Sequence, residues 1–426
     1  MQTVLTHVPF PPLPAPPSWY PGHMTRFTRQ LPALLTRTDV VLELRDSRLP
    51  LTSINSNLEA AIKKWQASRG RFLGPSVDPT QRLIGNGTEG QVCERIVVFN
   101  KRDLVPEWGY EPFRRAWGTR FPGQHVFFAS WTKPKDVKTL SDLLVTLAKR
   151  NPFATEMNVL VIGMPNVGKS SLINALRNAG ISGRTPKAMR TSANPGHTQT
   201  ISTRLKLNED PLVYSYDSPG VMLPFLGNGP LGAERGAKLA LISGLKEGLY
   251  DPLTLAEYLL YRLNNLSPKY PSYMQLLPPN TPPIADLHQF LTLISQRHGM
   301  IKRGNEQDLQ RAATRFINWW REEGGLRSAS VPGRLLISGP SIEPQRRGWG
   351  FDFEWTVDGT EQGDEVTVIQ RKMEESIDHY EEALAEEERD GGGISTTQQK
   401  KWIKAEKIEK RKARTRIRAT RKGYKL

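Results

Sequence analysis

Two short segments of this chain combine residue types and spacing that suit them to hold a nucleotide. Residues 163–170 read Gly-Met-Pro-Asn-Val-Gly-Lys-Ser, the Gly-x4-Gly-Lys-Ser form of a phosphate-binding loop. Its two glycines permit a tight turn whose backbone N–H groups surround phosphate oxygens at the start of a helix. Lys169 would contact the β- and γ-phosphates, and Ser170 would give Mg²⁺ an oxygen ligand. The nucleotide-binding residues expected here are Val167, Gly168, Lys169, Ser170 and Ser171.

The second segment is Asn100-Lys101-Arg102-Asp103, which has the Asn-Lys-x-Asp form of a guanine-selecting element. The Asp103 carboxylate can accept hydrogen bonds from guanine N1–H and N2–H₂, a pair of donors that adenine does not offer. Taken alone, the same residues also describe a charged turn after a strand. In most guanine-nucleotide proteins the phosphate loop comes first, whereas here the base-selecting element precedes it. Both motifs are intact although their order along the chain is reversed. The sequence therefore predicts the same folded site, reached by a different chain connectivity.

Residues 217–220, Asp-Ser-Pro-Gly, have the Asp-x-x-Gly form that completes such a site. Asp217 is expected to hold Mg²⁺ through water, and the Gly220 N–H to lie near the γ-phosphate. A polar segment before them, residues 182–199, is predicted to be a mobile switch. Its Thr198 is the expected second hydroxyl ligand of Mg²⁺. Lys169 and Thr198 are therefore predicted to serve catalysis as well as binding.

Each motif follows an apolar run that predicts a buried strand, at residues 96–99, 159–162 and 213–216. A further run, residues 126–128, ends at Ala129-Ser130, where Ser130 is a predicted backbone contact to guanine O6. Open α/β sheets place ligands at the carboxyl ends of their strands, so these segments are expected at one edge of a sheet. The predicted fold class is α/β with a phosphate-loop nucleotide-binding domain. Several motifs in mutually consistent places favour the nucleotide site over the charged turn.

Residues 19–24 read Trp-Tyr-Pro-Gly-His-Met, and residues 46–50 read Asp-Ser-Arg-Leu-Pro. With the motifs above, they resemble the circularly permuted GTPases of ribosome assembly. That group includes bacterial ribosome biogenesis GTPase A and its mitochondrial ribosome-associated counterpart. The resemblance covers about residues 18–327. Ser47 stands where Ala is usual, Ala129-Ser130 is a loose form of the base-contact motif, and residues 69–91 read as an insertion.

The resemblance implies a GTP hydrolase that acts as a checkpoint in large ribosomal subunit assembly. Its ligands and partners would be GTP, GDP, Mg²⁺ and the large subunit with its rRNA. Val221 stands where many GTPases carry a water-orienting Gln. The resemblance implies that His23 instead swings toward the γ-phosphate when a ribosomal particle binds, although a bare Pro-Gly-His-Met segment reads as a structural turn. Asn166 matches an asparagine that helps related GTPases bind K⁺. We also expect a monomer, with peripheral inner-membrane association as a further expectation.

The composition of the chain favours an anionic macromolecule as its partner. The 426 residues carry a formal charge of +16 and a sequence pI near 9.8, a profile typical of nucleic-acid binders. No apolar run is long enough for a transmembrane helix, so none is expected. Cys93 is the single cysteine, which excludes an intrachain disulfide or a cysteine metal cluster and fits a reducing compartment.

The charge is concentrated near the end of the sequence. Residues 374–390 carry nine acidic residues, and residues 400–426 carry thirteen basic residues against two glutamates. We expect this basic tail to contact rRNA phosphates. A solvated appendage and a nuclear-localisation signal are the alternatives.

The chain is predicted to divide into four parts. Residues 1–25 form a Pro-rich leader ending in the Trp-Tyr-Pro-Gly-His-Met motif, 26–248 the permuted GTPase domain, 249–328 a helical RNA-binding-type domain, and 329–426 an extension. In the helical domain, residues 305–308 are expected to start a helix. In the extension, short strands are expected at 335–337 and 351–355. The apolar stripe of that helix is expected in the core: Leu309, Ala312, Ala313, Phe316, Ile317 and Trp320.

The resemblance implies a mitochondrial location, in the matrix or at the inner membrane. No acidic residue precedes Asp39, which is compatible with a short transit region. Two other functions stay open. One is a GTP-dependent rRNA-binding scaffold with vestigial hydrolysis, which Val221 permits. The other is a nuclear pre-60S assembly GTPase, which the basic tail permits.

The base-selecting role of Asp103 gives a first prediction. Asp103→Asn should weaken GTP binding and strengthen xanthosine triphosphate binding, because xanthine offers an acceptor where asparagine can donate. One unmatched buried polar group costs about 1–3 kcal/mol, or roughly tenfold to a hundredfold in affinity. Calorimetric titration of both nucleotides measures the switch. Equal affinity of the unmodified protein for ATP and GTP would refute the assignment.

Overall fold

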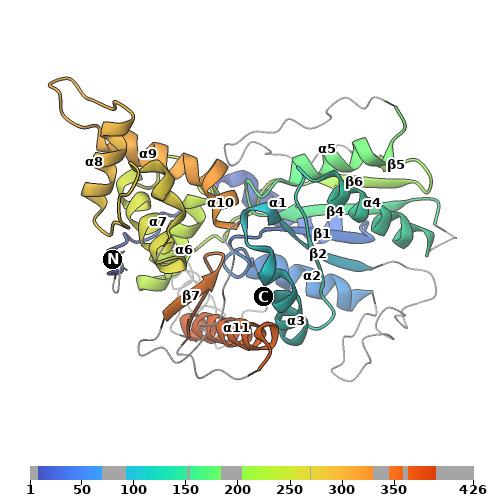
Figure 1. The fold of residues 1–426 in the computed structure, drawn as a ribbon. Coiled ribbons are helices and arrows are strands. Elements are labelled where there is room, and N and C mark those ends of the chain that lie inside the picture. The colour runs from blue at the N-terminus through green and yellow to red at the C-terminus, as the bar shows by residue number, and fades with distance from the viewer. Residues whose placement is uncertain are drawn as a thin grey trace, which may run out of the picture.

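The centre of the protein is a six-stranded sheet (Figure 1). The computed structural model describes residues 8–69, 93–150, 154–183, 204–268, 270–329, 345–357 and 363–389, so Thr198 and the basic tail lie outside the described residues. The strand order is β3-β2-β1-β4-β6-β5, and the neighbours pair in parallel except β5 with β6. The strands are β1 Val40–Asp46, β2 Glu94–Asn100, β3 His125–Phe128, β4 Met157–Gly163, β5 Leu205–Asn208 and β6 Val213–Asp217.

Helices cover both faces of the sheet (Figure 1), so its central strands are buried. β1 and β2 are buried along their whole length, as expected for parallel strands between two layers. On one face, Val40 and Leu42 pack with α4 (Pro134–Lys149) and α5 (Lys169–Gly180). On the other face, Val41 packs with α1 (Gly22–Leu35) and α2 (Ser56–Ser68). Figure 1 shows these two layers, and the predicted α/β fold class is confirmed.

The register of the sheet brings distant motifs to one edge. β1 lies between β2 and β4 and pairs with both. Its Asp46 lies opposite Asn100 of β2, and its Leu44 lies opposite Gly163 of β4. The phosphate loop and the base-selecting element therefore follow the carboxyl ends of two strands on either side of β1, although the loop comes later in the chain.

A group of helices follows the sheet domain. Its elements are α6 Gly229–Leu241, α7 Pro252–Leu266, η3 Ser272–Leu276, α8 Leu287–Arg297, α9 Leu309–Trp319, the π-helical turn η4 Trp320–Gly324, and α10 Gly325–Ala329. The Asp308 carboxylate caps α9 by accepting from the Arg311 N–H at 3.1 Å, which agrees with the predicted helix start. Phe316, Ile317 and Trp320 of the predicted stripe are buried, and Trp319 is buried as well. The expectation that the stripe belongs to the core is confirmed.

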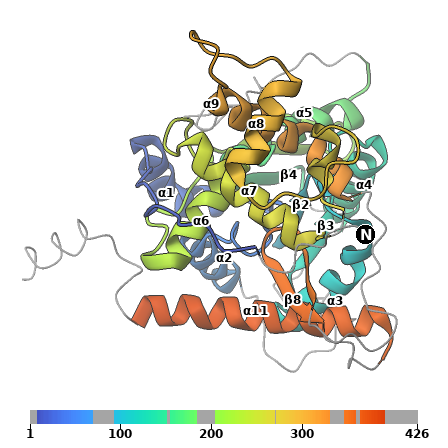
Figure 2. The same ribbon diagram turned by 60° about the vertical axis from the view of Figure 1, so that its left-hand side comes forward.

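The extension beyond residue 328 contributes to the core of the sheet domain. It forms a hairpin of β7 (Gln345–Trp349) and β8 (Phe353–Val357), followed by α11 (Glu365–Arg389). Trp349, Phe353 and three α11 side chains share one apolar cluster with Phe99 of β2 and Phe113 of α3 (Tyr110–Arg120). Figure 2 shows α11 lying along α3 and β8. The strand expected at 351–355 is found two residues later, and residues 335–337 lie outside the described residues.

The hairpin also joins the sheet domain to the helices. The Asp352 carboxylate accepts from the backbone N–H groups of Leu51 and Thr52, each at 2.8 Å. Arg262 of α7 donates to the Phe351 carbonyl at 2.9 Å.

The predicted domain boundaries stay predictions. Helix α1 begins at Gly22, so it runs across the boundary predicted at residue 25. Among the described residues, no helix is long and apolar enough to cross a membrane.

The hairpin gives a prediction about stability. Trp349 has no exposed surface, and its indole N–H donates to the Pro106 carbonyl at 2.9 Å. Trp349→Ala should lower the free energy of unfolding by about 3–5 kcal/mol, since it leaves a large cavity among aromatic rings. Equilibrium denaturation measures this.

The control for that variant is Tyr270→Ala. Tyr270 is an aromatic residue whose surface is 57% exposed, so its loss should cost little. Equal costs for both substitutions would contradict the contribution of the hairpin to the core.

Candidate functional site

The two predicted nucleotide motifs are joined by direct hydrogen bonds. The Asn100 side-chain amide, at the end of β2, donates to the Val167 carbonyl in the phosphate loop at 2.7 Å. The Lys101 ammonium donates to the Asn166 carbonyl at 3.1 Å. These bonds cross more than sixty residues of sequence and hold the base-selecting turn beside the phosphate loop. The structure therefore brings together the two segments whose order along the chain is reversed.

The phosphate loop has the backbone conformation that its glycines predict. Gly168 has φ of +95°, a left-handed value that favours glycine. A Cβ there would lie 2.5 Å from Asn100 Nδ2 and 2.9 Å from the Trp131 indole nitrogen. Gly220 of the Asp-x-x-Gly segment is equally confined, because a Cβ there would lie 2.6 Å from the Pro165 backbone. Three loops from different strands thus pack together without room for a methyl group.

The predicted magnesium ligands lie next to each other. The Ser170 hydroxyl donates to Asp217 Oδ2 at 2.7 Å. Burial raises the pKa of Asp217, against the opposing effects of the Lys169 charge and the Ser170 hydrogen bond. A hydroxyl and a buried carboxylate at the start of a helix form a set of oxygen donors that fits Mg²⁺. Thr198, the other predicted ligand, lies outside the described residues.

Lys169 is buried and turned toward its own loop. Its ammonium donates to the Met164 carbonyl at 2.7 Å. Burial lowers its pKa to about 8, and the nearby Asp217 carboxylate opposes that shift. An ammonium in such surroundings lacks a full set of anionic partners, which a phosphate group can supply.

On the base side, Asp103 lies in the short 3-10 turn η1 (Arg102–Leu104). Its Oδ1 is buried and accepts no hydrogen bond from any described residue. Buried carboxylate oxygens are nearly always paired, so this one fits an acceptor for N–H groups of a ligand. The pairing of Asp103 with guanine stays a prediction.

Sequence reasoning missed the residues that hold these motifs in place. Asp136, on α4, accepts from the Arg102 guanidinium at 2.6 Å and from the Ser130 backbone N–H at 2.9 Å. The Ser130 N–H is thus already occupied by Asp136, and the predicted contact from Ser130 to guanine stays untested. The Trp131 indole donates to the Gly168 carbonyl at 3.2 Å. Lys101 forms an ion pair with the Asp46 carboxylate at 3.1 Å. None of these long-range pairs has a local sequence signal.

His23 lies in the first turn of α1, near the segment that follows Gly220. The neighbouring Met24 sulfur accepts from the Met222 backbone N–H at 3.5 Å. His23 Nε2 is buried without a hydrogen-bond partner among the described residues, and burial lowers the pKa of the imidazole. Val221 is fully buried in the cluster that includes Phe27, so its side chain cannot take the place of the missing Gln. The catalytic role of His23 stays a prediction.

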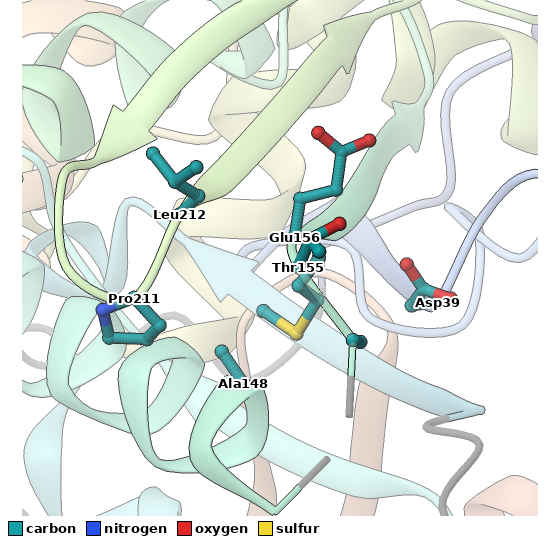
Figure 3. A pocket seen from close by; sticks show the side chains of 8 residues that line it. Asp39, Ala148, Thr155, Glu156, Pro211 and Leu212 are labelled. Carbon is teal, nitrogen blue, oxygen red and sulfur yellow. The ribbon is translucent and has the colours of Figure 1, made fainter. Parts of the chain in front are cut away.

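A small cavity lies at the opposite ends of the strands (Figure 3). Its volume of about 20 Å³ is enough for one water molecule. Asp39 and Met157 line it at the starts of β1 and β4, whereas the phosphate loop follows the end of β4. This cavity is therefore separate from the nucleotide site.

Comparisons with known proteins agree with this geometry. A family model described as a 50S ribosome-binding GTPase matches residues 158–246. Mitochondrial GTPase 1 of Schizosaccharomyces japonicus is 32% identical over 289 residues, covering 67% of this chain and 81% of that protein. Mitochondrial ribosome-associated GTPase 1 of Xenopus tropicalis is 29% identical over 291 residues, covering 67% and 81%. The chain belongs to the mitochondrial GTPase 1 family.

Membership of the mitochondrial GTPase 1 family confirms the predicted GTP hydrolase activity and the mitochondrial location. It sets the nuclear alternative aside. GTPases generally use Mg²⁺, whereas the K⁺ site at Asn166 stays a prediction. A solved structure, GNP-bound YlqF from T. maritima, is 19% identical with a TM-score of 0.40, covering 71% of this chain and 95% of that one.

The confinement of Gly168 gives a third prediction. Gly168→Ala should weaken GDP and GTP binding by roughly tenfold to a hundredfold, because the methyl group displaces the Asn100 amide from the Val167 carbonyl. Fluorescence titration with a labelled nucleotide measures the loss.

The matched control is Gly248→Ala. Gly248 has φ of +84°, but a Cβ added there would have no atom within 4 Å, so the substitution introduces backbone strain without a clash. If both variants lose affinity equally, strain rather than loop contact would explain the effect.

Lys169 gives a fourth prediction, on pH. The pKa of Lys169 in the free protein is about 8, and phosphate groups beside the ammonium would raise it. Between the two values, the bound protein holds a proton that the free protein lacks. Nucleotide binding should therefore take up protons above about pH 8, and affinity should fall as pH rises.

Calorimetry at about pH 8.5 in two buffers of different ionisation enthalpy measures this uptake. The control is Lys169→Arg, whose guanidinium stays protonated and should show no uptake. Identical heats in both buffers for the unmodified protein would exclude titration of Lys169.

Proposed function

We propose that this mitochondrial GTPase acts as a GTP-dependent checkpoint in the assembly of the mitochondrial large ribosomal subunit. The observation that carries the proposal is the pair of hydrogen bonds that join Asn100 and Lys101 to the phosphate loop. Relatives in the same family include proteins named ribosome-associated. The match to the 50S ribosome-binding GTPase model supports the same partner. The formal charge of +16 fits an rRNA surface.

In this proposal, GTP and Mg²⁺ bind where the phosphate loop meets β6. Ser170 and Asp217 would hold the metal, Lys169 would contact the phosphates, and Thr198 of the 182–199 segment would be a further metal ligand. Ordering of the switch would favour the rRNA-bound state, and hydrolysis would release it. When bound there, Mg²⁺ would neutralise negative charge on the phosphates.

His23 is proposed to act on the attacking water. Val221 is buried and apolar, so this function needs another polar group near the γ-phosphate. His23 has a buried ring nitrogen without a partner among the described residues, and it adjoins the Met24 contact to the segment after Gly220. Its lowered pKa favours a neutral imidazole, the form that can accept a proton from water.

The rRNA surface is proposed to include the helical domain and the basic residues 400–426. The K⁺ site at Asn166, the monomeric state and a peripheral contact with the inner membrane belong to the proposal as further expectations. A second candidate function is an rRNA-binding scaffold that binds GTP but hardly hydrolyses it. The buried Val221 favours that alternative.

Co-sedimentation tests the proposed partner. The protein loaded with a non-hydrolysable GTP analogue should sediment with mitochondrial large-subunit particles, and the GDP-loaded protein should not. Small-subunit particles serve as the control. Binding to neither particle, or equal binding with both nucleotides, would refute the checkpoint.

The proposed role of His23 gives a fifth prediction. His23→Ala should leave GTP affinity unchanged and lower the particle-stimulated hydrolysis rate by about a hundredfold, the scale of general acid-base catalysis. Lys169→Ala serves as the contrast, because it should weaken both nucleotide binding and turnover. An unaltered stimulated rate in His23→Ala would return His23 to a structural role. Absence of particle-stimulated hydrolysis in the unmodified protein would instead favour the scaffold.

A further inference from the structure

The turn after β1 places a buried carboxylate between two cations. Asp46 lies 3.1 Å from the Lys101 ammonium of the base-selecting turn. It also accepts from the Arg48 guanidinium at 2.9 Å and 2.8 Å. Asp46 and Arg48 are both buried. The position of Lys101 therefore depends on a carboxylate that Arg48 holds by a two-point contact.

Arg48 also reaches the helical domain. Its guanidinium lies 4.9 Å from the centre of the Trp320 ring, in the π-helical turn after α9. Trp320 in turn stacks on Phe351 of the C-terminal hairpin, with ring centres 5.0 Å apart and planes inclined by 20°. The Phe351 backbone N–H donates to the Arg48 carbonyl at 2.8 Å. Arg48 is thus held by Asp46 and Trp320 at its guanidinium and by Phe351 at its backbone carbonyl.

A second contact joins the same two regions. Gly325, at the start of α10, packs so closely on Leu104 of η1 that an added Cβ would lie 3.1 Å from the leucine side chain. Leu104 directly follows Asp103 in the base-selecting turn. Figure 1 shows α10 between the helical domain and the sheet. Residues 320–329 therefore contact Leu104 of the base-selecting turn directly and Arg48, the partner of Asp46, at a separate point.

We propose that Arg48 is a positioning residue that couples the guanine-nucleotide site to the helical domain through Asp46 and Lys101 on one side and Trp320 on the other. This inference rests on the proposed function only for what the helical domain would bind. Lys101 holds the phosphate loop at the Asn166 carbonyl, so any shift of the Arg48–Asp46 pair reaches both halves of the nucleotide site. Movement of the helical domain then changes nucleotide affinity, and nucleotide occupancy biases the helical domain by the same factor.

The physical reason for the coupling is the isolation of the charges. Burial disfavours an ionised Asp46, but the charges of Arg48 and Lys101 outweigh that effect and hold the pKa of Asp46 well below its ordinary value. Arg48 and Lys101 share this one carboxylate, and displacing it would leave both cations without their common anionic partner, so the three groups have little freedom to separate. Trp320 covers the Arg48 guanidinium, and Arg48, Asp46 and Trp320 are all buried.

The test uses a matched pair of adjacent tryptophans. Trp320→Leu removes the ring beside Arg48, whereas Trp319→Leu removes a ring that stacks on Phe316 inside the helical domain. Both rings are buried, so both variants lose comparable packing. The GDP affinity of the isolated protein is measured by calorimetry, and melting temperatures record the stability of each variant.

We expect Trp320→Leu to weaken GDP binding by about fivefold or more, the lower end of typical coupling between sites. Trp319→Leu should leave the affinity within about twofold. Trp320→Phe keeps an aromatic face over Arg48 and should restore much of the affinity. It also provides a folded variant if Trp320→Leu is unstable.

A double substitution distinguishes coupling through Arg48 from a general loss of packing. Arg48→Ala should weaken GDP binding, and adding Trp320→Leu to it should cause no further loss, because residues on one path are not additive. Equal losses from Trp319→Leu and Trp320→Leu, or additive losses in the Arg48→Ala background, would overturn the proposal. No ribosomal particle enters this experiment, so failure of the proposed ribosomal function would leave its result intact.

Discussion

The bond from the Asn100 side chain to the Val167 carbonyl sets the geometry on which the rest of the protein depends. It joins the loops that leave β2 and β4, two strands that lie on either side of β1. The bond can form only if β1 fits between those strands in a register that brings Asp46 level with Asn100. Gly168 must then lack a side chain, since the Asn100 amide occupies the space of its Cβ. Sheet order, register and loop composition are therefore linked by one contact.

The parts of this arrangement that were predictable are those with local signals. The phosphate loop, the Asp-x-x-Gly segment and the apolar runs before them are contiguous in the sequence, and each has a fixed spacing. The α9 stripe was equally clear, because Phe316, Ile317 and Trp320 recur at helical intervals. Local patterns also predicted that the motifs meet at the carboxyl ends of the strands.

The parts that were missed depend on partners far away in sequence. Asp136 holds Arg102 and Ser130 from another helix, and nothing in its neighbourhood distinguishes it from a helix-starting acid. The α11 helix was hidden for a different reason. Its sequence is dominated by acidic residues, which predict a solvated segment. Its Ile369, Met373 and Ile377 nevertheless recur every four residues and form a buried stripe. That periodicity was the available signal for a packed helix.

The place of Trp349 in the core has a consequence for how the protein is made. Phe113 and Trp117 are synthesised early, but the cluster that buries them is closed by Trp349, Phe353 and α11, near the end of the chain. The side of α3 that contacts Trp349, Phe353 and α11 therefore stays uncovered until residues 345–389 have been made, although the nucleotide motifs are complete by residue 220. A nascent chain with exposed aromatic surface is prone to aggregation. A chain that stops short of residue 345 would contain its GTP-binding motifs but would lack the aromatic residues that complete this cluster.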